Sequence, residues 1–271
     1  MRLRFCGVRG STPAPGAEFV RVGGNTSCVA VTPAGEAAPR LLLDAGTGIR
    51  SVTSLLDGGP FRGTILLTHL HWDHVQGLPF FAAGDRDDAD VRLHVPDEGV
   101  DAASTLARAM SPPHFPIGPD GLRGRWSFST LAEGAHAFEG IDVLAREIPH
   151  KGGRTFGYRL TDGTGSIAYL PDHLPARTGP TRDAALALAD GVDVLIHGGQ
   201  FVAAEAATAT AFGHATIDAA LALAVEAGVG RVILSHHGPG RTDDAIDELA
   251  ASCAGAALGV TMAVEGMDCG P

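Results

Sequence analysis

Residues 68–74 read Thr-His-Leu-His-Trp-Asp-His and come directly after the apolar run 65–67. They bring three imidazoles (His69, His71 and His74) and the carboxylate of Asp73 together within six residues, at the end of a predicted buried strand. Protonated histidines this close together would repel one another, whereas neutral imidazoles and carboxylates are good ligands for Zn²⁺ and similar cations. The segment therefore predicts a metal site at the end of a strand.

Short apolar runs bounded by glycine or proline recur along the chain and predict further buried strands. Helical patterns follow Thr216 and Thr242, two threonines suited to cap a helix N-terminus. Strands that alternate with helices indicate an α/β fold in which helices pack on sheets. No repeat or linker-like change of composition interrupts the chain, so we expect a single domain over residues 1–271. The predicted strands are residues 41–43, 65–67, 91–95, 167–170, 192–196 and 232–234.

Three later residues extend the candidate metal site. His150, Asp172 and His236 each follow an apolar run as its first or second polar residue. Functional loops of α/β folds gather at the ends of such strands, so we expect these side chains to meet at one edge of the sheets. Together with residues 69–74 they form a set of seven candidate ligands.

Composition excludes several classes of protein. The chain has 271 residues, of which 45% are hydrophobic and 19% charged, so it is neither a disulfide-stapled miniprotein nor a disordered tail. Its net charge is −11 and Lys151 is its single lysine, which disfavours bulk nucleic-acid binding. No run approaches the ~20 apolar residues of a membrane helix. Four scattered cysteines and the absence of a signal-like N-terminal stretch favour a cytoplasmic protein with reduced thiols.

The His-x-His-x-Asp-His motif, followed in order by His150, Asp172 and His236, resembles the metal-binding signature of the metallo-β-lactamase superfamily. The resemblance implies a four-layer αββα sandwich, with two mixed sheets face to face and helices outside. It also implies two divalent metal ions, with Zn²⁺ expected and Mn²⁺ or Fe²⁺ as alternatives. By this resemblance Asp172 bridges the two metals, which are held by His69, His71 and His150 on one side and by Asp73, His74 and His236 on the other.

A second sequence element indicates which branch of the superfamily the chain resembles. Residues 213–216 read Gly-His-Ala-Thr, and a predicted helix and strand then lead to His236. This is similar to the Gly-His-Ser-Thr element of tRNase Z and of bacterial phosphoribosyl cyclic phosphodiesterases, and the segments around Asn25 and Asp44 also resemble the latter enzymes. Near His197 the chain reads His-Gly-Gly-Gln, without the glutamate of the tRNase Z pattern. The resemblance therefore implies phosphodiester chemistry and argues against tRNase Z itself.

The implied mechanism is attack on phosphorus by a hydroxide that bridges the two metals. Asp73 and His214 are the predicted catalytic residues. A protonated His214, at the mouth of a helix, is expected to donate a proton to the leaving oxygen. Other side chains are expected to support the ligands or to line the path of the substrate: Asn25, Asp44, His114, His173, His197 and His237.

The leading interpretation is thus a metal-dependent phosphodiesterase that acts on a small phosphodiester, cyclic phosphodiesters included. Two alternatives stay open. One is a hydrolase of an ester, lactone or thioester that uses the same metals, and the other is a non-hydrolytic binding protein of cofactor biosynthesis. We expect a small-molecule partner and no membrane partner, and a homodimer is left open.

Overall fold

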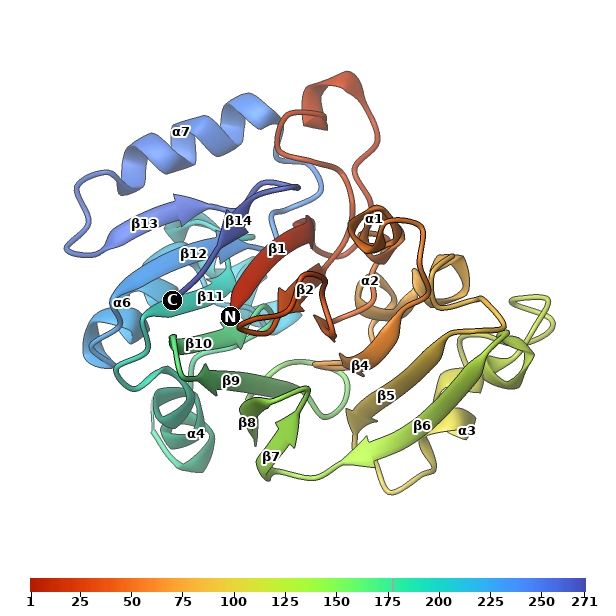
Figure 1. Cartoon of the computed structure of the whole chain (residues 1–271). Helices are drawn as coiled ribbons and strands as arrows, with labels where there is room; N and C mark the ends of the chain where they lie inside the picture. Colours follow the sequence, from red (N-terminus) through yellow and green to blue (C-terminus); the bar gives the residue numbers. More distant parts are fainter. Residues whose placement is uncertain (177) are drawn as a thin grey trace.

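The computed structural model describes residues 1–176 and 178–271, and over these residues the chain forms two seven-stranded sheets (Figure 1). The first sheet has the order β14-β1-β2-β3-β4-β5-β6 and is parallel from β3 to β6. Its strands are β1 (Arg2–Gly7), β2 (Cys28–Thr32), β3 (Leu41–Leu43), β4 (Arg62–Leu66), β5 (Asp90–Pro96), β6 (Arg125–Leu131) and β14 (Asp268–Cys269).

The second sheet has the order β13-β12-β11-β10-β9-β8-β7 and is parallel from β10 to β13. The remaining pairs in this sheet are antiparallel. Its strands are β7 (Gly134–Phe138), β8 (Ile141–Glu147), β9 (Phe156–Asp162), β10 (Gly165–Leu170), β11 (Val194–Gly198), β12 (Arg231–Ser235) and β13 (Gly259–Met262).

Helices cover the outer faces of both sheets (Figure 1). On the first sheet, α1 contacts β1 and β2, and α3 contacts β6. On the second sheet, α4 contacts β8 and β9, and α6 contacts β11 and β12. This arrangement confirms the predicted αββα sandwich. The helices are α1 (Ile49–Val52), α2 (Trp72–Val75), α3 (Ala102–Ala107), α4 (Pro180–Ala189), α5 (Ala206–Phe212), α6 (Ile217–Glu226) and α7 (Asp243–Cys253), with 3₁₀ turns η1 (Ala17–Phe19), η2 (Thr53–Leu56), η3 (Leu78–Phe80), η4 (Pro119–Gly121) and η5 (Ala203–Glu205).

The strand β3 shows why continuous apolar runs form these sheets. Successive side chains of a strand point to opposite faces. Leu41 and Leu43 therefore pack into the core between the two sheets, while Leu42 packs into the core beneath the helices of the first sheet. All three side chains are fully buried. A strand buried on both faces carries no polar alternation, and for this reason its sequence reads as a plain apolar run.

The predicted helices also have the expected ends. The side chain of Thr216 accepts a hydrogen bond from the backbone of Ala219 and caps α6, and Thr242 caps α7 through Ala245. Several strand boundaries differ from the prediction. β4 ends at Leu66 rather than at residue 67, and β11 begins at Val194, because Val192 lies in the turn that follows α4. None of the helices in the described part of the chain is long and apolar enough to cross a membrane.

The topology brings the candidate site to one edge of the sandwich. Parallel neighbours end at the same edge of a sheet, so the segments after β10, β11 and β12 emerge together. The segment after β4 emerges from the facing sheet. The site is therefore built from loops that follow strands of both sheets.

Candidate metal centre

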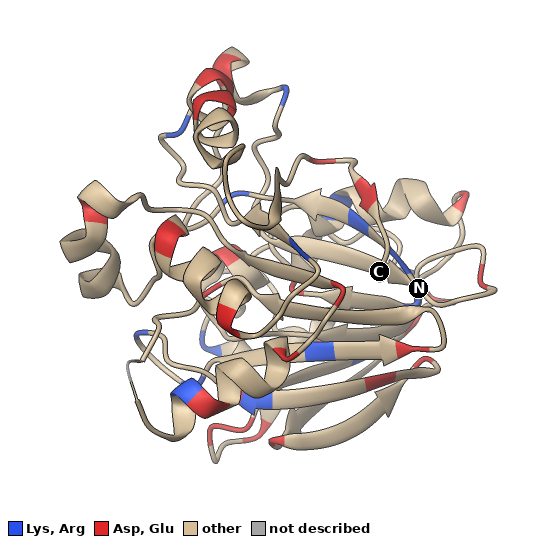
Figure 2. Cartoon of the chain, turned by 90° about the vertical axis from the view of Figure 1, so that its left-hand side faces the viewer, with Lys and Arg blue, Asp and Glu red and all other residues tan. Residues whose placement is uncertain are grey.

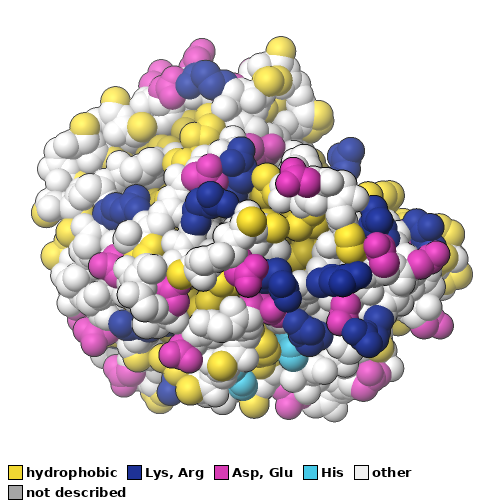
Figure 3. Space-filling view, in the orientation of Figure 1, with side chains coloured by type: hydrophobic (Ala, Val, Ile, Leu, Met, Phe, Trp, Pro, Cys, Tyr) yellow, Lys and Arg dark blue, Asp and Glu magenta, His cyan; other side chains and the backbone are white. Residues whose placement is uncertain are grey.

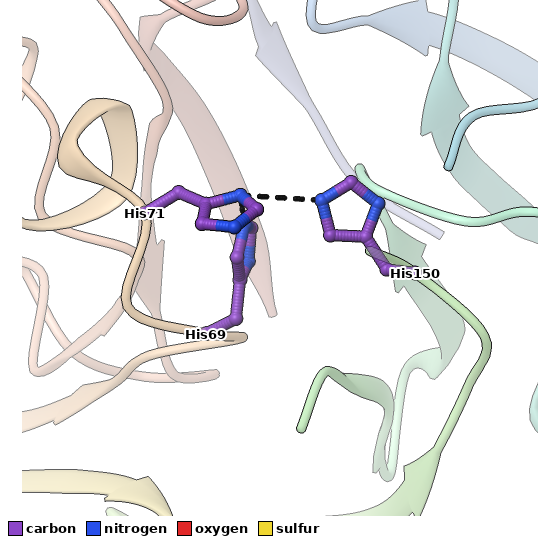
Figure 4. Close-up of side chains that lie close together, drawn as sticks. All are labelled: His69, His71 and His150. Carbon is purple, nitrogen blue, oxygen red and sulfur yellow. Dashed lines mark hydrogen bonds between the residues drawn. The ribbon is translucent and has the colours of Figure 1, made fainter. Parts of the chain in front are cut away.

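The first group of side chains that could hold a metal ion is His69, His71 and His150 (Figure 4). His69 and His71 come from the loop after β4, and His150 comes from the loop after β8 in the facing sheet. The Nε2 atom of His69 lies 2.9 Å from Nδ1 of His71, which lies 3.2 Å from Nε2 of His150. Three ring nitrogens from two sheets thus converge on one point.

The second group is Asp73, His74 and His236. The Nε2 atom of His236 lies 3.1 Å from Oδ2 of Asp73 and 3.3 Å from Nε2 of His74. All three residues are at least 95% buried, since their exposed fractions are 5%, 0% and 1%. The segment after β12 therefore meets the start of α2 inside the protein.

Asp172, in the segment after β10, lies between the two groups. Its Oδ2 atom is 3.0 Å from Nε2 of His74 and 3.2 Å from Nε2 of His236. Its Oδ1 atom faces the first group, 3.7 Å from Nε2 of His150. One carboxylate thus contacts both groups with different oxygens.

Asp44 orients the imidazole of His74 in the second group. Its left-handed backbone (φ 61°), which is uncommon for a residue other than glycine, turns the chain directly after β3. Its carboxylate accepts hydrogen bonds from the backbone and hydroxyl of Thr68, from Tyr169 Oη at 2.9 Å and from His74 Nδ1 at 2.8 Å. Because a carboxylate accepts the Nδ1 proton, Nε2 of His74 is directed into the centre.

Two glycines allow other ligands to approach. The Nδ1 atom of His150 donates to the carbonyl oxygen of Gly213 at 2.7 Å, and a Cβ on Gly213 would lie only 2.6 Å from the backbone nitrogen of Lys151. A Cβ on Gly10 would lie 2.3 Å from Nδ1 of His236. Both distances are far below van der Waals contact, so these two positions accommodate only glycine, which has no Cβ.

The charges of the cluster are those of a cation site. Burial, followed by the charge of His74, lowers the pKa of His69 well below its ordinary value. Burial also opposes protonation of His74, but Asp44, Asp73 and Asp172 outweigh it and raise the pKa of His74 well above its ordinary value. Three carboxylates thus favour positive charge at the position of the His74 ring.

The donor atoms fit a divalent cation. The carbonyl of Gly213 accepts the Nδ1 proton of His150, so Nε2 presents a lone pair to Nδ1 of His71 and to Oδ1 of Asp172. The buried Oδ2 atom of Asp172 lies 3.0 Å from Nε2 of His74 and 3.2 Å from Nε2 of His236. Lone pairs and carboxylate oxygens repel one another at these distances, whereas a cation would attract them all. Imidazole nitrogens together with carboxylate oxygens suit zinc and similar metals.

His214 lies beside this centre, between α5 and α6. Its Nδ1 atom is 3.5 Å from Oδ1 of Asp172, and its ring lies 5.6 Å from that of Phe201. Burial lowers the pKa of His214 to about 4, although Asp172 opposes the shift. The imidazole is therefore neutral at neutral pH, which differs from the protonated form expected from the sequence. A neutral imidazole still has one N–H to donate.

The structure brings some of the remaining predicted residues to the centre and leaves others away from it. Asn25 donates through Nδ2 to Glu265 at 2.9 Å, and Nε2 of His237 lies 2.9 Å from the carbonyl oxygen of Ala263. These contacts join the loop after η1 and the end of β12 to the segment that follows β13. Neither side chain reaches the metal-ligating groups, because each is bonded to this neighbouring segment.

His173 and His197 lie behind the centre as a buried pair, with His173 Nδ1 3.1 Å from His197 Nε2. His173 directly follows Asp172, so the pair packs under a residue of the centre. His114 instead lines an open cavity together with His69 and His71.

A family model described as a β-lactamase superfamily domain matches residues 39–237. The match covers most of the chain and includes every side chain of the two groups and Asp172. The chain belongs to the metallo-β-lactamase superfamily. Its His/Asp clusters are those of a metal-binding hydrolase of this superfamily, as the sequence predicted.

Relatives in this superfamily include nucleases. The chain is 31% identical over 147 residues to ribonuclease BN of Escherichia coli O81 (strain ED1a), an alignment that covers 54% of this chain and 42% of the relative. It thus spans less than half the length of that relative. It is 29% identical to ribonuclease Z of Lacticaseibacillus casei (strain BL23), over 87% of this chain and 84% of the relative.

The fold is shared with solved structures of the superfamily. The metallo-β-lactamase fold protein YhfI of Bacillus subtilis superposes with a TM-score of 0.73 at 16% identity, over 99% of both chains. At this identity the likeness concerns the fold. It supports the sandwich described above.

Sequence reasoning missed several residues of this metallo-β-lactamase superfamily site. The backbone N–H of Ser11 donates to Oδ2 of Asp73 at 2.6 Å, and a backbone amide leaves no signal in a sequence. Thr68 and Tyr169 hold Asp44 in place. Thr68 could have been found from its position directly before His69. Tyr169 reads as one more apolar residue of a strand, so its hydroxyl role needs the three-dimensional structure.

Proposed function

We propose that this protein is a two-metal phosphodiesterase that acts on small phosphodiesters. The observation that carries the proposal is the position of Asp172, whose Oδ2 atom faces His74 and His236 while its Oδ1 atom faces His150. A site for one metal ion would not require a carboxylate whose two oxygens face different sets of ligands. Two-metal sites are a common means of cleaving phosphate esters.

In this proposal His69, His71 and His150 hold one cation, Asp73, His74 and His236 hold the other, and Asp172 contacts both. Zn²⁺ is the first candidate, with Mn²⁺ and Fe²⁺ as alternatives. When bound, two such cations lower the pKa of a coordinated water and neutralise charge on the phosphoryl oxygens. The buried carboxylates of Asp44 and Asp73 keep the imidazoles in the orientation that this requires.

The protein's own groups would complete the reaction. His214 stands at the edge of the centre and can donate its N–H to the departing oxygen, so it stabilises the charge that develops there. The N–H of Ser11 is already bonded to Asp73 and fixes that ligand. We therefore assign catalysis to His214 and the positioning of Asp73 to Ser11.

The phosphodiester class is supported by relatives whose names are ribonuclease BN and ribonuclease Z, since RNA is joined by phosphodiester bonds. A small substrate is supported by the surface charge. Figure 2 shows acidic residues on several helices of one face, with Lys and Arg residues scattered among the rest. Figure 3 shows basic side chains gathered among acidic ones. Ion pairs such as Arg92 with Glu139 and Arg125 with Asp90 neutralise part of the positive charge of the protein. The face in Figure 3 does not offer the uninterrupted basic surface that polymeric RNA would need.

The test is hydrolysis by the purified, metal-loaded protein. We expect turnover of bis(p-nitrophenyl) phosphate that disappears in His69→Ala, since this variant lacks a ligand of the first group. p-Nitrophenyl acetate and a lactone serve as acyl substrates. Turnover of the acyl substrates alone would replace the proposal with an ester or lactone hydrolase, and tight binding of a phosphodiester without turnover would favour a binding protein.

A further inference from the structure

A cavity of about 910 Å³ opens beside the metal centre. His69 and His71 are among its lining residues, so the cavity adjoins the first group of candidate ligands. Its walls come from α2, the turn η3, the helix α3 and the loop that carries His114 and Phe115. A cavity of this size accommodates an organic ligand rather than an ion alone.

The walls of this cavity are mainly apolar. Leu106 and Met110 are buried at one side, and Phe80 meets Phe115 in an edge-to-face pair with ring centroids 5.8 Å apart. Trp72, which follows His71 directly, is 75% exposed on the same cavity. Aromatic walls of this kind favour a planar aromatic ligand through stacking and edge contacts.

Exposed apolar side chains concentrate at this place. Six large hydrophobic side chains are exposed in the described part of the chain, and three of them line the cavity: Trp72 at 75%, Phe80 at 56% and Val100 at 53%. Exposed apolar surface is unfavourable in water, and its concentration beside a reactive centre indicates a ligand that covers it.

The same cavity carries positive charge at its rim. Arg108 and Arg154 line it, against a single acidic residue, Glu98. The guanidinium of Arg154 is engaged by Glu147 and by the carbonyl oxygen of Asp97, so Arg108 is the cation that can turn toward a ligand. An apolar cavity with a basic rim suits an organic anion.

The cavity and His214 lie against different parts of the centre. His214 contacts Asp172 and the ring of His150, whereas the cavity reaches His69 and His71. Among the described residues that line the cavity, His214 does not occur. A group that departs beside His214 therefore leaves on a side other than the cavity.

We propose that this cavity binds an aromatic substituent of the phosphodiester, namely the one that stays on phosphorus. This inference rests on the proposed function. In the reaction a water oxygen bonds to phosphorus and the water loses one proton, while the bond from phosphorus to the other ester oxygen breaks. That oxygen takes up this proton as it leaves on the side of His214. The aryl phosphate monoester remains with its ring in the cavity.

The first test is binding to the zinc-loaded protein, measured by calorimetry. Diphenylphosphinate, dibutylphosphinate and dimethylphosphinate carry the same charge as a phosphodiester and have no ester bond to hydrolyse. We expect diphenylphosphinate to bind at least about tenfold more tightly than either alkyl compound. Equal affinity of the diphenyl and dibutyl compounds would overturn the aromatic assignment.

Variants locate the binding site. In Phe80→Ala we expect the ratio of diphenyl to dimethyl affinity to fall toward one, because the edge-to-face wall is lost. The matched control is Val225→Ala, which truncates a 56% exposed apolar side chain on α6 outside the cavity and should keep the wild-type ratio. An unchanged ratio in Phe80→Ala would place the aromatic ring elsewhere and overturn the inference.

Kinetics separate this inference from the proposed function. p-Nitrophenyl phenyl phosphate and p-nitrophenyl methyl phosphate share one leaving group and differ only in the retained group. We expect kcat/KM to be higher for the phenyl compound by about tenfold or more. Equal rates would overturn the cavity assignment and leave the phosphodiesterase standing. Absence of turnover for both, with tight binding of diphenylphosphinate, would overturn the function and leave the cavity assignment standing.

Discussion

The Nδ1 atom of His74 lies 2.8 Å from Oδ2 of Asp44, a residue thirty positions earlier in the chain. Asp44 is fully buried and stands in a left-handed backbone conformation at the end of β3. The contact couples the central strands of the first sheet to the metal centre. Because of this contact, the orientation of the candidate ligand His74 depends on Asp44, which is not itself a member of either group of candidate ligands.

Asp44→Asn tests this dependence. Asparagine tolerates the left-handed conformation, so the backbone should be kept while the carboxylate charge is lost. We expect the affinity for zinc to fall by about 10- to 100-fold, as is typical when the partner of a metal-ligating histidine is removed. Competition with a chromophoric chelator measures the affinity. Asp142→Asn, an exposed change on β8, is the control, and equal zinc affinity in both variants would contradict the role of Asp44.

Gly10→Ala should disturb the second group alone. The added Cβ would lie 2.3 Å from Nδ1 of His236 and would force the ring to move. We expect the bound zinc, measured by elemental analysis, to fall from two equivalents toward one. Gly255→Ala adds a methyl group where nothing lies within 4 Å and should retain both. Two full equivalents in Gly10→Ala would show that His236 is not needed for the second metal.

Metal binding should release protons, with an affinity that rises with pH. The pKa values of His74 and His236 are raised because the nearby carboxylates outweigh burial, so a cation must displace protons from these rings. As the pH rises toward the raised pKa values, fewer protons compete and zinc binds more tightly. Calorimetric titration in two buffers of different ionisation enthalpy counts the released protons. A heat that does not depend on the buffer would contradict this account.

His214→Ala should separate catalysis from metal binding. His214 lies outside the two groups that we assign to the metals, although with His150 and Asp172 it forms a further set of donor atoms within 4.8 Å of one another. We expect both metals to stay in this variant, whereas the loss of its N–H should lower kcat by about 10²- to 10⁴-fold. Metal content and phosphodiester turnover are measured on the same preparation. His69→Ala, in contrast, should lose metal together with activity. Loss of metal in His214→Ala would reassign His214 as a ligand.

Arg9→Met should destabilise the fold. The guanidinium of Arg9 is fully buried and donates to the carbonyl oxygens of Gly23 and Arg241 at 2.7 and 2.6 Å, with Asp243 nearby at 3.7 Å. Methionine leaves these partners unpaired, and we expect the free energy of unfolding to fall by about 3–5 kcal/mol. Urea denaturation measures it. Arg4→Met removes an exposed ion pair with Asp268 and should cost less than about 1 kcal/mol.

The fold could be predicted where local patterns report burial on both faces. The runs at 41–43 and 167–170 became β3 and β10, because a strand covered on both sides is apolar throughout. The strands β6 and β7 were not predicted. Most of their residues are exposed or half-buried, so their sequences carry no continuous apolar run.

The candidate ligands could be predicted because metal-ligating residue types stand next to strand ends. The geometry brings His69, His150 and Asp172 together from both sheets, which spacing alone cannot show. The cavity beside Trp72 and Phe80 was not predicted. Whether an aromatic side chain faces solvent or the core is decided by neighbours distant in the sequence, and no local pattern records them.

The most direct test of the central claim is anomalous diffraction at the zinc edge from crystals of the zinc-loaded protein. The account predicts two peaks about 3.5–4 Å apart, one at the nitrogens of His69, His71 and His150 and one at Asp73, His74 and His236, with Asp172 between them. A single peak, or zinc bound away from these side chains, would contradict it.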